Sequence, residues 1–148
     1  MARRPVSVLL LGIVMLALLI VGIVSGTILR HIAQTLPIAI IFAAMWAGVP
    51  RGWLPAAALA IHLFWLYVMI AIWLFLTGLA RIVTGHFTPV EIALTLIIGA
   101  AAMAGTVQAL RDVIATAKWH IAIATFAIAA VLQYAAFWVS TRTAIARM

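Results

Sequence analysis

The sequence contains no cysteine and only two acidic residues among its 148 residues. Without cysteine there can be no disulfide, no catalytic thiolate, no iron–sulfur cluster and no cysteine-bound zinc. The two carboxylates, Glu91 and Asp112, lie in separate segments and do not form an acidic pair that could bind magnesium. The sequence offers no Ser–His–Asp set, phosphate loop or HExxH motif either. We therefore expect a protein that is not an enzyme.

Charge of either sign is scarce, because only 7% of the residues are charged and 69% are hydrophobic. Soluble domains are about 45–50% apolar and about 25% charged, so this composition excludes a soluble domain. A membrane-spanning helix needs about 20 apolar residues, and the chain has enough for about five such helices. Lipid offers no hydrogen-bond partner to a backbone, and no run shows the two-residue alternation of a barrel strand. We expect a single all-α integral-membrane domain over residues 1–148.

Short polar connectors divide the chain into five apolar runs. The expected spans are residues 6–29, 32–49, 54–80, 90–110 and 120–139. The second run is the weakest, because Gln34, Thr35 and Pro37 lie near its start, so four spans plus one re-entrant or interfacial helix is the alternative. The first run is longer than the apolar core of a signal peptide, and we expect it to be retained as a span. Cleavage near Ser25 is the alternative.

The formal charge of +7 comes from basic residues that lie mostly one at a time at the ends of the apolar runs. This pattern is typical of membrane-end anchoring and attraction to anionic lipid, so we expect the lipid bilayer as a partner and no nucleic acid. The basic residues divide five to four between the two sides, which does not fix the orientation. The compact loops and the alanine-rich composition favour a bacterial inner membrane.

His62 is the one ionisable residue well inside a predicted span. It lies about 12 Å along the helix axis from Leu54, at 1.5 Å per residue. Ionisable residues within the bilayer usually face the interior of the bundle and often mark a functional site. The simpler interpretation is a neutral histidine bonded to a neighbouring helix, and the alternatives are haem ligation, quinone binding or a proton relay.

Glu91 is a second candidate for proton or cation binding in the membrane. The segment Thr88-Pro89-Val90-Glu91 also has the spacing of a capping box, with threonine at the N-cap, proline at the first helical position and glutamate at the third. In that interpretation the carboxylate accepts the backbone proton of Thr88 and complements the positive end of the helix dipole. We expect the capping role, with a functional carboxylate as the alternative.

The remaining histidines lie in or near the connectors. His120 lies at the start of the last span and is the candidate partner of His62, but its expected depth differs by about 10 Å at 1.5 Å per residue. Two axial ligands of a haem b would need matching depths, so we expect no cofactor, with haem or quinone as the alternative. His31 and His86 are expected to lie near each other on the opposite side, where two histidines alone make a weak metal site.

Small residues form two candidate surfaces for close helix packing. Gly22, Ser25 and Gly26 form a GxxxG pattern in the first span, and Ala101 and Gly105 lie on a similar surface in the fourth. Small residues let helix backbones approach closely, which drives association in lipid. The pattern fits a subunit interface and packing within the chain equally well.

Three functions remain open at this stage. The leading hypothesis is an accessory or structural subunit of a larger membrane complex, whose partners are other membrane subunits or further copies of this chain. The second is a small oligomeric transporter in which Glu91 and His62 are the proton-sensitive groups. The third is a redox anchor that binds haem or quinone at His62.

Overall fold

The computed structural model describes residues 6–48, 52–116 and 118–142, and these ranges contain five helices and no strand. The helices are α1 (Val6–Val24), α2 (Ile28–Trp46), α3 (Leu54–Leu76), α4 (Pro89–Thr116) and α5 (Trp119–Ser140). Each of the five is long and apolar enough to cross a membrane. The predicted fold class is therefore confirmed, and the weak second run forms a 19-residue helix of spanning length.

The helix ends differ from the predicted span ends. The first run stops as a helix at Val24, because Gly26 adopts a positive φ of 68° and reverses the chain into α2. Gly78, with a φ of 75°, ends α3 in the same way before residue 80 is reached. Side chains with a Cβ rarely adopt this conformation, so glycine is the residue that permits both turns. In contrast, α4 runs six residues beyond the predicted end at 110.

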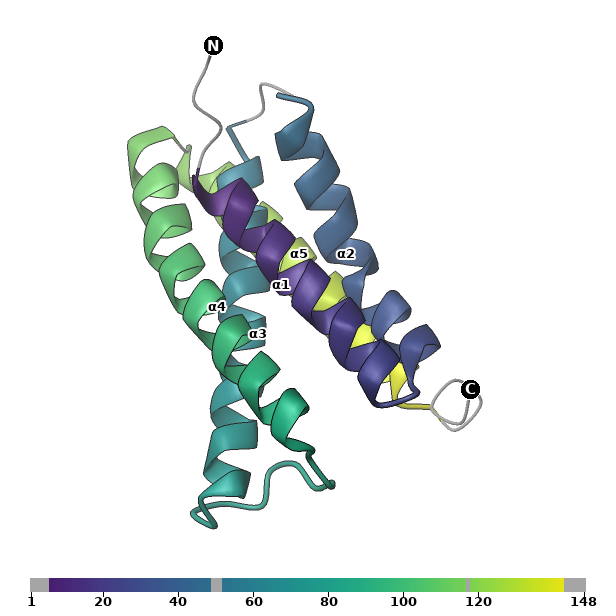
Figure 1. Cartoon of the computed structure of the whole chain (residues 1–148). Helices are drawn as coiled ribbons and strands as arrows, with labels where there is room; N and C mark the ends of the chain where they lie inside the picture. Colours follow the sequence, from purple (N-terminus) through teal and green to yellow (C-terminus); the bar gives the residue numbers. More distant parts are fainter. Residues whose placement is uncertain (1–5, 49–51, 117, 143–148) are drawn as a thin grey trace.

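The helices pack as a closed ring in the order α4, α1, α2, α5 and α3. Helix α1 therefore lies between α4 and α2, and α3 lies between α5 and α4 (Figure 1). The core contains apolar residues from several helices, among them Leu11, Val14, Ile38, Ile61 and Ala102. Helix α5 is the most exposed member of the ring. Its large outward side chains are apolar, as expected for a face in contact with lipid.

The bundle is not equally tight along its length. Figure 1 shows the lower end of α3 and the loop that follows it lying well apart from the lower ends of α1, α2 and α5. We call this end of the bundle, where residues 77–88 connect α3 to α4, the loop end. A cavity lined by residues of α1, α2, α3 and α4 opens at this end.

One polar network joins α2 to α5 inside the bundle. The Gln34 side chain donates to Ser140 Oγ at 2.9 Å, and the Gln133 side chain donates to the Gln34 carbonyl oxygen at 3.0 Å. Pro37 lacks a backbone N–H and disturbs the hydrogen bonding of the preceding turn of α2. Hydrogen-bond donors from a neighbouring helix commonly make such a proline tolerable in a membrane. In this bundle the Gln133 side chain of α5 is a donor of this kind, to the Gln34 carbonyl oxygen in the turn before Pro37.

Several aromatic residues lie near the ends of the helices. Trp46 and Trp119 are exposed on the last turn of α2 and the first turn of α5. Tyr134 and Trp138 are exposed near the opposite end of α5, where the Arg142 guanidinium lies 3.5 Å from the centre of a Trp138 ring. Amphipathic rings favour the headgroup region, so these positions are consistent with a membrane-interface belt.

Candidate functional site

A cavity of about 550 Å³ opens at the loop end of the bundle. Helices α1 and α2 form one side, α3 and α4 form the other, and Phe137 of α5 also contributes. The volume falls within the range of about 300–1,000 Å³ that is usual for small-molecule sites. The polar side chains and groups on its wall come from two helices and two turns: Ser25, Thr27, Arg30, His31, Gln34, Thr84, His86, Thr88, Glu91 and Thr95.

Glu91 lies on the cavity wall and is held by the start of its own helix. The backbone N–H of Thr88 donates to Glu91 Oε2 at 2.7 Å, and the backbone N–H of Glu91 donates to Thr88 Oγ1 at 3.2 Å. These reciprocal bonds confirm the predicted capping box. The carboxylate is 9% exposed and already has a donor, so capping is its visible role.

Arg30 and His31 belong to α2 and not to a connector, because this helix begins at Ile28. His31 Nδ1 lies 3.0 Å from the Thr27 carbonyl oxygen and 3.1 Å from Thr27 Oγ1, and its side chain is buried. The neighbouring Arg30 has a buried Nε for which no described residue provides an acceptor. The cavity thus contains a carboxylate with a partner and a guanidinium with an unsatisfied donor.

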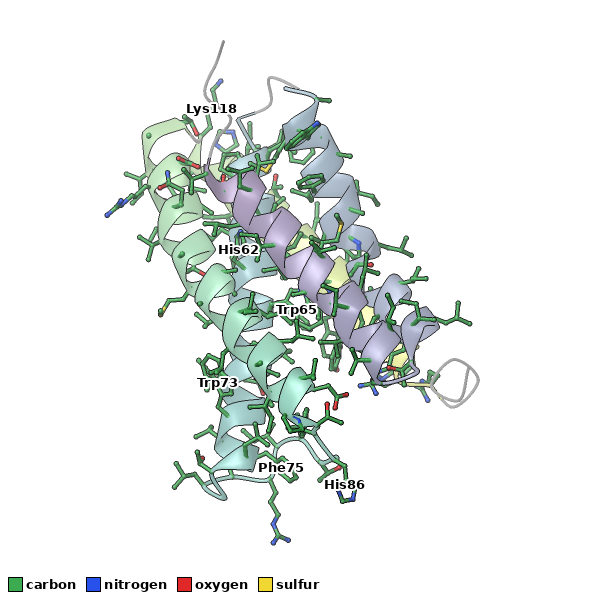
Figure 2. The ribbon with its side chains drawn as sticks, viewed as in Figure 1. His62, Trp65, Trp73, Phe75, His86 and Lys118 are labelled. Carbon is green, nitrogen blue, oxygen red and sulfur yellow. The ribbon has the colours of Figure 1, made fainter. Side chains whose placement is uncertain are left out.

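His86, in the loop between α3 and α4, also borders this cavity. Its side chain is exposed at the outer edge of the loop (Figure 2). The expectation that His31 and His86 lie near each other is consistent with their shared place on this wall. Within the described part of the chain, no group of three or more histidine, aspartate or glutamate side chains could hold a metal ion.

His62 lies away from this cavity, fully buried on α3 one turn before Trp65 (Figure 2). Its ring packs so tightly on α4 that a Cβ added at Gly105 would come closer than 3.0 Å to three ring atoms. Neither ring nitrogen makes a hydrogen bond to a described residue. The imidazole therefore fills space between α3 and α4, and it does not face the cavity that contains Glu91.

A second polar cluster lies at the opposite end of the bundle from the loop end. Ser7 Oγ donates to Asp112 Oδ2 at 3.3 Å, and the Gln108 side chain donates to Asp112 Oδ1 at 3.0 Å. A serine of α1 and a glutamine of α4 thus hold this carboxylate near the end of α4. The bond from Ser7 ties α1 to α4 and contributes to closing the ring.

The other predicted site residues lie apart from one another. His120 is exposed on the first turn of α5, so the structure does not pair it with the buried His62 as two haem ligands would require. Ser25 and Gly26 are exposed in the turn after α1, and a Cβ added at Gly26 would meet nothing within 4 Å. These two residues therefore do not pack between helices of this chain, and their role in a subunit interface stays a prediction.

Gly22, Ala101 and Gly105 do lie between helices. A Cβ added at Gly22 would lie 2.8 Å from His31 Cβ, so α1 and α2 approach closely there. Ala101 is buried in the main core, and Gly105 accepts the His62 ring. Sequence reasoning missed Gly99, whose added Cβ would collide with the Trp73 ring. All four small residues are therefore used by contacts within this chain.

Trp73 and Thr95 connect α3 and α4 at a position closer to the loop end than His62. The indole N–H of Trp73 donates to Thr95 Oγ1 at 3.1 Å, and this hydroxyl in turn donates to the Ile92 carbonyl at 2.8 Å. Thr95 also borders the cavity, so the bond positions part of the cavity wall. In the sequence, the place of Thr95 beside the cavity is indicated by its spacing, one helical turn after Glu91.

Comparison with protein families, with characterised proteins and with solved structures finds no match to this chain. Five apolar helices of spanning length, with aromatic residues at their ends, are those of a small integral membrane protein.

Proposed function

We propose that the chain works as a non-enzymatic accessory subunit of a larger membrane assembly, in a bacterial inner membrane. The observation that carries this proposal is the position of Tyr67. Its side chain is 61% exposed, on an outward face of α3 that also includes Leu63 and Ile70. Tyr67 lies two residues from the middle of the helix, which is about 3 Å along the axis.

A phenol at this depth has no hydrogen-bond partner if lipid chains cover it. Tyrosine is favoured at the membrane interface, where its hydroxyl meets water or headgroups, and a buried hydroxyl usually finds a partner. Polar side chains also join neighbouring helices in membranes. A transmembrane helix of a partner subunit, with an acceptor at the depth of Tyr67, would provide what lipid does not.

Photo-crosslinking in native membranes tests the proposal directly. A benzophenone amino acid replaces Tyr67 in one variant and Ile128 in the control, because both residues are 61% exposed and both lie near the middle of their helices. We expect a single heterologous adduct of defined mass from position 67 and none from position 128. Equal yields from the two positions, or no adduct from position 67, would contradict the proposal.

The hydroxyl itself is tested with Tyr67→Phe, which preserves the ring. We expect this variant to lose co-purification of the partner that position 67 captures, while the unfolding temperature of the purified protein stays unchanged. If Tyr67→Phe retains that partner fully, the hydroxyl is not the reason for the contact. An adduct with twice the mass of this chain would overturn the hetero-assembly and favour a self-associated oligomer.

The cavity gives the small-transporter alternative one supporting observation. It opens at one end of the bundle and has Glu91 on its wall, as a proton-coupled site would require. Glu91→Gln in proteoliposomes distinguishes the two roles. Loss of pH-driven proton flux with unchanged stability would support the transporter, whereas unchanged flux with at most a small loss of stability would favour the capping role.

A further inference from the structure

We propose that the cavity at the loop end binds one amphiphilic molecule with an acyl chain and an anionic head group. This inference is independent of the proposed function, because the cavity lies inside the ring of helices and Tyr67 faces outward. Three properties of the cavity suit such a molecule: its apolar deep part, its polar mouth, and the different hydrogen bonding of the two charged side chains, Arg30 and Glu91, on its wall.

The deep part of the cavity suits an acyl chain. Its wall includes Leu18 of α1, Val68 and Met69 of α3, and Ile98 of α4, all of which are buried in the bundle. The buried Trp65 of α3 also lines the cavity. Burying apolar chain surface here is favourable by about 25 cal/mol for each Å² removed from water.

The mouth of the cavity combines one cation and one carboxylate with very different surroundings. Glu91 accepts the Thr88 N–H at 2.7 Å and lies at the positive end of the α4 dipole. Arg30 is half-buried, and its Nε is shielded from solvent with no acceptor among the described residues. The group without a partner at this mouth is therefore a hydrogen-bond donor, the Arg30 Nε–H. A ligand would have to bring an acceptor to it, whereas Glu91 already has a donor.

The chemistry of Arg30 specifies the head group. A guanidinium presents a planar fork of donors that matches the two oxygens of a carboxylate or a phosphate. A cationic head group would have to compete with the Thr88 amide for Glu91, and a neutral head group would leave the guanidinium without a counter-ion. The shared chemistry is an anionic head group, supplied either by a free fatty acid or by an anionic phospholipid.

Native mass spectrometry of the detergent-solubilised protein tests this inference with oleate as the probe and oleyl alcohol as its uncharged counterpart. The variant is Arg30→Gln, and the matched control is Arg81→Gln. Arg81 is an exposed cation in the loop between α3 and α4 that does not border the cavity. We expect Arg30→Gln to weaken oleate binding at least about tenfold, since a hydrogen bond to a charged group is lost. Arg81→Gln should bind oleate like the unmodified protein.

Equal affinity for oleate and oleyl alcohol, or equal weakening by both glutamine variants, would overturn the inference. A second variant, Ile72→Trp, fills the cavity without touching either ion, and it should abolish binding of one oleate per chain. Retained binding in Ile72→Trp would place the oleate elsewhere and also overturn the inference. Competition then identifies the source: displacement of oleate by phosphatidylglycerol indicates an anionic phospholipid, and no displacement indicates a single-chain acid.

Discussion

The contact between Gly105 and His62 gives the sharpest prediction about stability. In Gly105→Ala, the new methyl group would lie closer than 3.0 Å to three atoms of the His62 ring. The ring is fully buried, so it cannot move aside into solvent. Either α3 and α4 separate or the imidazole leaves its position, and both changes disturb the most closely packed part of the bundle.

Two opposing effects determine the magnitude. Alanine is favoured over glycine inside a helix by about 0.5–1 kcal/mol, so an unobstructed exchange would raise stability. Overpacking a filled core costs about 1–3 kcal/mol. We expect the second effect to win, with a net loss of about 1 kcal/mol or more in the free energy of unfolding. Gly12→Ala is the control, because its Cβ would lie 3.0 Å from one atom of the Phe42 side chain, which is only partly buried.

A double-mutant cycle with His62→Ala tests the cause. Removing the imidazole vacates the volume that the new methyl group needs, so Gly105→Ala should be neutral or stabilising in that background. The free energies of unfolding come from reversible SDS titration of the protein in mixed micelles. Coupling between two contacting residues is usually about 0.5–3 kcal/mol. If Gly105→Ala stabilises the unmodified protein, or if the two changes are additive, the packing argument is refuted.

Two further predictions concern hydrogen bonds that position the cavity wall. Thr88→Ala removes the N-cap acceptor of α4 and should cost about 0.5–2 kcal/mol of unfolding free energy, whereas Glu91→Gln keeps an oxygen acceptor and should cost less; the reverse order would contradict the capping role. Thr95→Val leaves the Trp73 indole N–H without its acceptor and should cost about 0.6–1.7 kcal/mol. Thr106→Val is its control, because that hydroxyl bonds only within α4, and equal losses would show that the bond between helices contributes nothing.

Hydropathy was sufficient to predict the number and type of the helices, because lipid requires every spanning segment to satisfy its own backbone. It could not locate the turn after Val24. Ser25, Gly26 and Thr27 interrupt the hydropathy of the run only weakly, and Gly26 resembles a packing glycine in the sequence. Only its backbone conformation, with φ of 68°, shows that it reverses the chain.

The candidate site was partly predictable. The spacing of Thr88 and Glu91 specifies a local capping geometry, so both bonds could be read from four consecutive residues. The sequence could not show that Arg30 borders the cavity or that Tyr67 faces outward. Which way a side chain points on an apolar helix depends on which helices lie beside it. That order around the ring is set by long-range packing, and the sequence gives no local sign that α1 lies between α4 and α2.

The order of helices in the ring has a consequence for biogenesis. Along the chain two helices lie between α1 and its neighbour α4, and two helices lie between α2 and its neighbour α5. The ring therefore cannot close until α5 has been inserted into the bilayer, and α1 waits there for α4 with α2 as its neighbour in the ring. This order fits a two-stage route, in which insertion of the helices comes first and lateral assembly follows.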